Sequence, residues 1–294
     1  ARLRHHLRDG MIAPTAFGLG PLPGTDLAAA ADVVLSESPL PYIPQLPDRG
    51  VGFDLVGRTA ALLEIPIAPG PRGWRVAARK RADADRMARD LDHLEALWHG
   101  KTDAVKVQLA GPFTLAAEVE MPNGHRMITD PGALRDITDA LLQASADHVR
   151  DVETRFGTAV LQLDEPRLGD VTRGTLSGAT DYETIAAIPE PQETLTRFGE
   201  HLLNTPVLID DTPWLTCDPR TCNRDALAKL LDQGTRIAIP TMQPRELYRI
   251  FDDIQIDPAT TPIDVYAKPA DALLGYAENL HAAREMHQEL TVEV

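Results

Sequence analysis

Cysteine is scarce in this sequence, and long apolar runs are missing. The 294 residues include only two cysteines, Cys217 and Cys222, too few for a disulfide framework, which fits a reducing compartment. No run approaches the roughly 18 consecutive apolar residues that a membrane-spanning helix needs. No charged segment followed by an apolar one opens the sequence, so we expect no secretory signal, although a start at Ala1 leaves a processed or trimmed beginning open. Together these absences predict a cytoplasmic protein.

Basic residues are also few relative to acidic ones. Lysine and arginine total 29 against 44 aspartates and glutamates, which gives a formal net charge of -15. Non-specific binding to nucleic acid or to a membrane surface requires a basic face, so the composition argues against both kinds of partner. A small-molecule ligand or a protein partner is favoured instead. A homo-oligomer is compatible with the sequence, which does not fix the oligomeric state.

Short apolar segments alternate with helical patterns along the chain. We expect strands over residues 11–19, 105–110, 159–163, 206–209, 235–239 and 263–267, with two more near 52–56 and 176–180. We expect helices over residues 27–36, 73–100, 131–156 and 271–289, the first of them capped by Thr25 or Asp26. This alternation indicates βα units and a parallel sheet. Eight strands of this kind close into a TIM (β/α)8 barrel, so we predict a single α/β barrel domain over residues 1–294.

Residues 37–50, ESPLPYIPQLPDRG, contain four prolines and cannot form a helix. An irregular surface connection is the simpler interpretation of this segment. A lid that closes over a site is the functional alternative.

The stretch from Ala159 to Gly169, AVLQLDEPRLG, is the most informative part of the chain. A short apolar run that stops at Asp164 and Glu165 is typical of a buried strand of a parallel sheet. Parallel α/β folds keep their functional groups at the carboxyl ends of their strands, where these two carboxylates would lie. In the alternative interpretation, Asp164 caps the next segment and Glu165 faces water.

Three segments resemble the cobalamin-independent methionine synthase family, and in particular its short, single-barrel members. They are FGLGPLPGTD (17–26), VQLAGPFTLAAEVE (107–120) and LQLDEPRL (161–168), in the family's order and spacing. The resemblance implies a TIM barrel of the kind shared with uroporphyrinogen decarboxylase. It also implies transfer of a methyl group from a methylated folate to homocysteine. In the family, the aspartate that matches Asp164 binds the amino group of the substrate, and an Ile-Gly-Ser turn, here Leu19-Gly20-Pro21, holds the amino acid.

The resemblance further implies a zinc ion that holds the homocysteine thiolate. Coordination to Zn²⁺ removes the thiol proton and leaves an open ligand position for the substrate. The family's ligands are a His-x-Cys, a Glu and a Cys at successive strand ends, which we place at residues 206–213, 236–241 and 264–271. None of these segments contains the required residue, so we predict no metal site of the family's kind.

Four carboxylates would then line the mouth of the predicted barrel: Asp164, Glu165, Asp210 and Asp211. Such a cluster cannot stay fully ionised without a cation or raised pKa values. It would suit a hard cation such as Mg²⁺, or an ammonium group on a substrate, better than a soft thiolate. We therefore expect Leu19, Gly20 and these four acids to bind an amino-acid-like molecule. This grouping fails if Asp210 and Asp211 lie at the opposite end of the barrel from Asp164.

Two functions remain in competition. The chain is either a methionine-synthase-like methyltransferase acting on homocysteine or a related amino acid, or a non-catalytic barrel that binds a small molecule or a partner. Catalytic residues and cofactor are left unassigned. Cys217 and Cys222, with His201 as the histidine nearby in sequence, are a weak metal signal, because structural zinc sites use four ligands.

Overall fold

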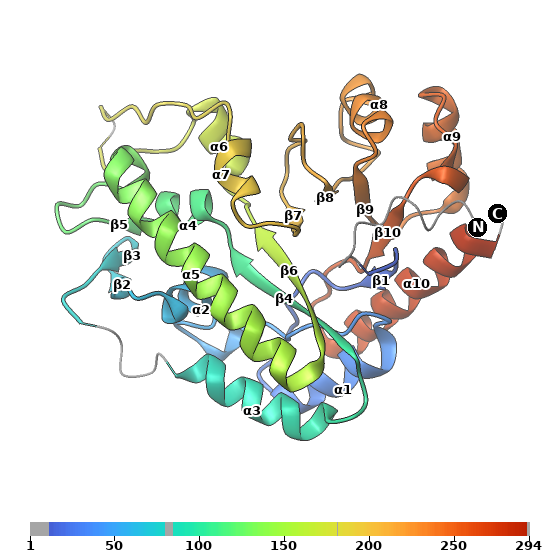
Figure 1. The fold of residues 1–294 in the computed structure, drawn as a ribbon, viewed down its shortest axis with the longest axis horizontal. Helices are drawn as coiled ribbons and strands as arrows, with labels where there is room; N and C mark the ends of the chain where they lie inside the picture. The colour runs from blue at the N-terminus through green and yellow to red at the C-terminus, as the bar shows by residue number, and fades with distance from the viewer. Residues whose placement is uncertain (1–11, 80–84, 181, 293–294) are drawn as a thin grey trace.

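The computed structural model describes residues 12–79, 85–180 and 182–292, and a parallel sheet of seven strands lies at its centre (Figure 1). In chain order, the strands are β1 (Ala16–Phe17), β4 (Ala104–Ala110), β6 (Thr158–Asp164), β7 (Leu202–Asn204), β8 (Trp214–Thr216), β9 (Arg236–Pro240) and β10 (Ile263–Tyr266). Their order in the sheet is β1-β10-β9-β8-β7-β6-β4, and every neighbouring pair is parallel. The sheet curls into a half-barrel, so the α/β class with a parallel sheet is confirmed.

The two edge strands of this sheet, β1 and β4, are linked by residues 40–43. The Leu40 amide donates to the Ala16 carbonyl at 3.4 Å, on the β1 side. On the β4 side, Lys106 N donates to Pro41 O at 2.8 Å and Ile43 N donates to Lys106 O at 3.0 Å. Apart from Glu37, which ends the helix Leu27–Glu37, the proline-rich segment contains no α-helix, as predicted, and its helical part is one 3-10 turn, Pro47–Arg49. It is nevertheless more than a surface connection, because it is bonded to both edges of the sheet.

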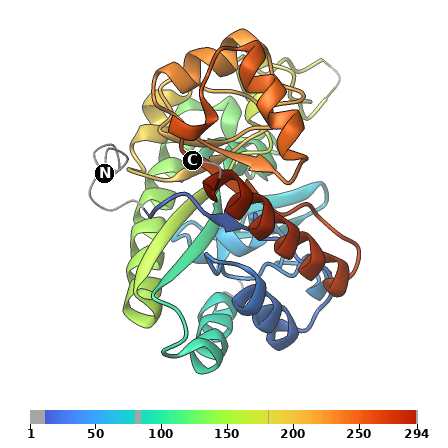
Figure 2. The same cartoon turned by 90° about the vertical axis from the view of Figure 1, so that its right-hand side faces the viewer.

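Helices cover the outer face of the curled sheet (Figures 1 and 2). They are α1 (Leu27–Glu37), α2 (Leu55–Leu62), α3 (Arg86–Trp98), α4 (Pro112–Glu118), α5 (Pro131–Phe156), α6 (Leu168–Arg173), α7 (Gln192–Thr196), α8 (Arg224–Asp232), α9 (Pro244–Asp253) and α10 (Leu273–Val292). The last helix, α10, packs against α1 and against the strands β1 and β10. Two further 3-10 turns, Met127–Thr129 and Pro258–Thr260, complete the helical elements of the described residues.

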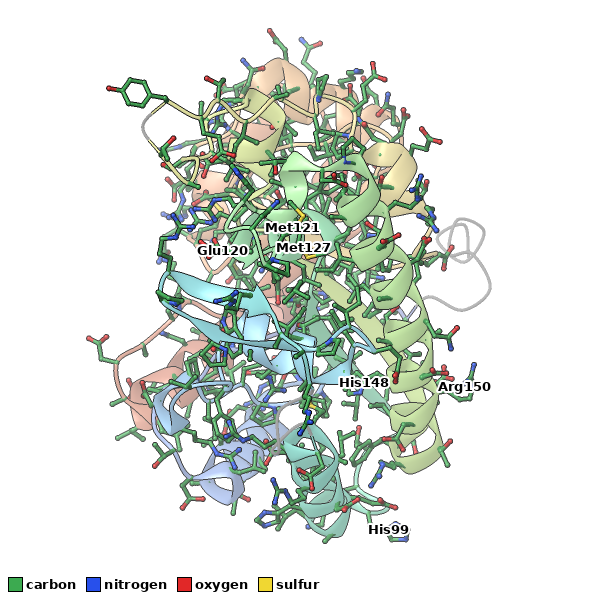
Figure 3. All side chains as sticks on the ribbon, turned by 90° about the vertical axis from the view of Figure 1, so that its left-hand side faces the viewer. His99, Glu120, Met121, Met127, His148 and Arg150 are labelled. Atoms are coloured by element: carbon green, nitrogen blue, oxygen red, sulfur yellow. The ribbon has the colours of Figure 1, made fainter. Side chains whose placement is uncertain are left out.

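Helix boundaries follow the capping residues that the sequence offers. Asp26 caps α1 by accepting hydrogen bonds from the amides of Ala28 and Ala29, at 2.9 and 3.1 Å, which confirms one of the two predicted caps. Helix α5 has the predicted limits and is amphipathic: His148 is buried on its inner side, whereas Arg150 points to solvent (Figure 3). None of the helices in the described residues has both the length and the apolar character needed to cross a membrane.

The prediction of one helix over residues 73–100 is wrong. Gly73–Val76 is instead strand β3, which pairs antiparallel with β2 (Ile67–Gly70) and parallel with β5 (Val119–Glu120) in a small second sheet. The physical reason is the turn at residues 70–73, in which Gly73 has a φ of 127°. The helix in this region, α3, does not begin until Arg86. Residues 80–84 of the predicted helix lie outside the described residues.

Three of the predicted strands are also wrong. Residues 52–56 form a turn and the start of α2, and residues 176–180 form a loop with a single bridge from Ser177 to Thr184. Residues 206–209 form a connection, and the strands on either side of it are β7 and β8. These two strands have only three residues each, too few to show a recognisable apolar pattern.

Candidate functional site

A cavity of about 890 Å³ opens at the carboxyl ends of the parallel strands. Its wall includes Leu19 and Pro21 after β1, Asp164 at the end of β6, and Asn204 at the end of β7. Residues that follow β7, β8 and β10 also line it, together with Leu55 and Tyr276. Parallel α/β proteins bind their ligands at this edge of the sheet, so the cavity is the candidate site.

Asp164 is the buried acid of this cavity. It is 5% exposed, and its Oδ1 accepts hydrogen bonds from Gln162 Nε2 at 2.7 Å and Asn204 Nδ2 at 2.6 Å. Its other oxygen, Oδ2, accepts no hydrogen bond that we find within the described part of the chain. Burial raises the pKa of this carboxyl group, and the two donors and the nearby Lys106 oppose that shift.

A buried lysine lies beneath Asp164. Lys106 Nζ donates to Gln162 Oε1 at 2.6 Å, so Gln162 bridges the lysine and the aspartate. The ammonium group also lies 5.3 Å and 5.1 Å from the ring centroids of Phe17 and Tyr42, within the range of cation–π attraction. Burial lowers the pKa of Lys106, and the charge of Asp164 raises it. A network of hydrogen-bonded side chains inside the curled sheet therefore holds the polar groups of the site in position.

Glu165 points away from the cavity. It is fully buried, and its carboxylate accepts hydrogen bonds from the amides of Phe113 and Thr114 and from the Thr114 hydroxyl, at 2.9, 2.7 and 2.6 Å. It thus binds the start of α4. Burial raises its pKa to about 7, against the effect of these three donors. The alternative interpretation of the acidic pair is wrong on both counts: Glu165 holds the helix start and does not face water, and Asp164 faces the cavity.

The Leu19-Gly20 turn lies beside the cavity as expected. Leu19 lines it, and its carbonyl accepts a hydrogen bond from Gln162 at 2.8 Å. Gly20 is not part of the cavity wall. It has a φ of 128°, and a Cβ at this position would lie 3.0 Å from the side chain of Gln45, so the turn requires glycine.

The structure does not bring Asp210 and Asp211 to the cavity, so the predicted group of four carboxylates is wrong. Asp210 pairs with Lys229 of α8 at 2.5 Å, and its side chain is 48% exposed. These residues belong to a connection that returns the chain to the start of β8, since Pro213 O accepts from the amide of Arg236, the first residue of β9. Asp164 is the last residue of β6, at the other end of the sheet.

The described residues do not fit a zinc ion. They contain no group of three or more His, Cys, Asp or Glu side chains arranged to hold a metal. The strand before β9 is β8, not residues 206–213, and its end offers Thr216, Cys217 and Asp218. The sequence suggests a position in the middle of a helix for His201, and this is wrong: His201 lies directly before β7, and its Nδ1 is hydrogen-bonded to Gly199 O at 2.9 Å.

Several polar residues of the site were not predicted from the sequence. They are Lys106, Gln162 and Asn204. The sequence does contain a pattern that indicates Lys106. VKVQLA (105–110) alternates apolar and polar residues within a strand that is buried along almost its whole length. Such alternation in a buried strand indicates that the polar side chains share one interior face.

Comparison with known proteins does not assign this chain to a family. No protein-family model matches the chain, and no curated protein matches it in a sequence comparison.

Proposed function

We propose that this chain is a TIM-type barrel that binds a small amino-acid-like molecule in the cavity, with the ligand's ammonium group on Asp164. The observation that carries the proposal is a carboxylate that is buried, lines a cavity at the carboxyl ends of parallel strands, and keeps Oδ2 without a donor among the described residues. When a ligand displaces water from the cavity, the open Oδ2 favours a cationic partner, because a carboxylate oxygen without a donor is costly away from water.

The barrel itself is part of the proposal. The hydrogen bonds of residues 40–43 to β1 and to β4 support an eighth, irregular strand that completes the half-barrel. Eight parallel strands with helices outside are the TIM architecture, whose sites lie at the edge where the cavity opens.

The remainder of the cavity suits a compact, partly apolar ligand. Its volume falls within the range of small-molecule pockets, roughly 300–1,000 Å³. Leu55, Val207 and Leu208 provide apolar wall, and Asn204 and Thr216 provide hydrogen-bonding groups. The two cysteines of the wall are free thiols, which supports a reducing compartment, and we propose the cytoplasm.

A binding measurement with one matched control tests the proposal. We expect calorimetry to detect L-methionine or L-homocysteine, and not the analogue that has hydrogen in place of the amino group. Asp164→Asn should weaken binding at least about tenfold, since a charged hydrogen bond of about 1.5–3 kcal/mol is lost. Asp210→Asn, which alters an exposed acid outside the cavity wall, should bind as the parent does. Equal binding of the deaminated analogue would refute the ammonium subsite.

Methyl transfer to a thiol is a second candidate function. The three segments that resemble the methionine synthase family lie together: Gly111 N donates to Asp164 O at 2.9 Å, and Gln162 donates to Leu19 O. This proximity supports the resemblance, whereas the missing zinc ligands oppose the family's chemistry. The test is methionine formation from homocysteine and a methylated folate, with Asp164→Asn as the inactive control. Turnover that Asp164→Asn abolishes would establish the transferase; ligand binding without turnover would leave the binding protein.

A further inference from the structure

The loop from Cys217 to Cys222, which follows β8 and precedes α8, places both thiols of the chain side by side. The two Sγ atoms are 3.7 Å apart, and both residues line the cavity. Cys217 is 5% exposed, and Cys222 is half-buried. One thiol is therefore accessible and the other lies behind it, within reach.

The hydrogen bond between the two thiols makes them chemically unequal. Cys217 donates to the Sγ of Cys222, and this bond lowers the pKa of Cys222, an effect reinforced by the positive charge of Arg224. The same bond, together with burial, raises the pKa of Cys217. The accessible sulfur is thus the better nucleophile, because the thiolate is the reactive form.

We propose that Cys217 and Cys222 form a redox-active dithiol in the cavity wall, which a low-molecular-weight disulfide converts into an intrachain disulfide. In the first step the Cys222 thiolate attacks one sulfur of the small disulfide, which forms a mixed disulfide and expels one thiolate. The expelled thiolate takes the proton of Cys217. The Cys217 thiolate then attacks the Cys222 sulfur and expels the second small thiolate, which takes up from water the proton that Cys222 released on forming its own thiolate. Two protein thiols are oxidised, and one small disulfide is reduced to two thiols.

The geometry supports this reaction better than metal binding. A disulfide needs the sulfurs to approach to about 2.05 Å. Cys222 lies directly before Asn223, the residue that caps α8, so the movement falls on a loop and not within a strand or helix. A zinc or similar site would need further ligands, and the part of the chain that the structure describes offers no group of three around these thiols.

Intact-mass spectrometry of the whole chain after treatment with oxidised glutathione tests the proposal. The parent should lose two hydrogen atoms and all reactivity toward a thiol reagent, and dithiothreitol should restore both. Cys217→Ser should trap one glutathione on Cys222, because the resolving thiol is gone. Cys222→Ser should react at least about tenfold more slowly than Cys217→Ser, since its remaining thiol is buried.

Stable glutathione adducts on the parent, disulfide-linked dimers or unchanged free thiols would each overturn the proposal. So would equal reaction rates of the two serine variants, because the roles of the two sulfurs would then be interchangeable. Near-ultraviolet circular dichroism would establish that each variant is folded, with Cys217→Ala as a second replacement at the buried position. The mass measurement needs no ligand, so its failure is distinct from a failure of amino-acid binding.

Discussion

At the scale of single residues, the adjacent acids Asp164 and Glu165 have two different roles: Asp164 lines the cavity, and Glu165 binds the start of α4. Successive side chains of a strand point to opposite faces, so Asp164 meets the cavity and Glu165 meets the start of α4. Burial raises the pKa of both carboxyl groups. The cost of burying Glu165 is offset by three donors from one helix start, and that of Asp164 by two side-chain amides.

The raised pKa of Glu165 makes a prediction about stability and pH. The folded state holds the proton up to a pKa of about 7, whereas the ordinary pKa of a glutamate side chain is 4.5. The folded state therefore binds more protons across that window, and its stability falls as pH rises from about 4.5 to 7. Glu165→Gln removes this contribution, so the variant's free energy of unfolding should fall less over that range, by up to about 3 kcal/mol. Urea unfolding at pH 5 and pH 7.5 measures the difference.

Glu118→Gln is the matched control for this experiment. Glu118 is paired with Arg167, and both side chains are partly exposed. Its replacement should keep the pH dependence of the parent. Parallel curves for the parent and Glu165→Gln would contradict the role assigned to Glu165.

The position of the two acids at a strand end could be predicted from the sequence. Which of them faces the cavity and which binds α4 could not. A seven-residue strand that ends in a carboxylate is a strong pattern, and it located Asp164 correctly. Which acid is bonded to α4 depends on how that helix packs against β6, a contact between residues about fifty positions apart. The predicted position of Asp210 and Asp211 at a strand end is wrong because the strand before them is short and ends at Asn204.

At the scale of elements, one buried ion pair connects three segments near the amino ends of the parallel strands, opposite the cavity. Arg236 of β9 contacts both oxygens of Asp264 of β10 at 2.6 Å. Its other donors reach the carbonyls of Ile12 and Ala13, and Asp264 accepts from the Thr15 amide. The pair therefore holds residues 12–15 in position to enter β1.

Breaking this pair from one side should be costly. Asp264→Ala leaves a buried guanidinium group without its carboxylate, so we expect the free energy of unfolding to fall by about 3–5 kcal/mol. The double replacement Arg236→Met with Asp264→Leu should be less destabilising than Asp264→Ala, because no buried charge remains. Asp210→Ala, which breaks an exposed pair, should cost less than about 1 kcal/mol. Urea unfolding ranks the variants, and a double replacement that is worse than Asp264→Ala would contradict the argument.

Elements with a strong local pattern were predicted well, and elements that depend on tertiary contacts were not. The limits of α5 follow from its long apolar period and from Asp130, which caps it by accepting from the Ala133 amide at 2.8 Å. The segment 40–43 gives no strand pattern, because Pro41 interrupts it and Pro39 and Pro44 flank it, and the backbone bonds to β1 and β4 define its place. Sequence patterns report local preference, and these bonds join distant parts of the chain.

At the scale of the whole molecule, the link through residues 40–43 decides whether the sheet is a closed barrel. Lys106 N donates to Pro41 O, so its exchange with solvent reports on that link. If the barrel is closed, we expect the amides of Lys106 and Ile43 to exchange only through global unfolding, as slowly as the slowest amides of β6. Hydrogen exchange followed by NMR measures this. Exchange of these two amides at a much lower opening free energy would show an open edge between β1 and β4.

The pairing of β1 with β10 has a consequence for how the chain is made. Ala16 lies opposite Val265, and Phe17 O accepts from the amide of Ala267, about 250 residues later. While the chain grows on a ribosome, β1 has no partner on this side until β10 has been synthesised. Folding of the complete sheet must therefore follow synthesis of nearly all the residues described, and until then the nascent chain carries an unpaired strand edge.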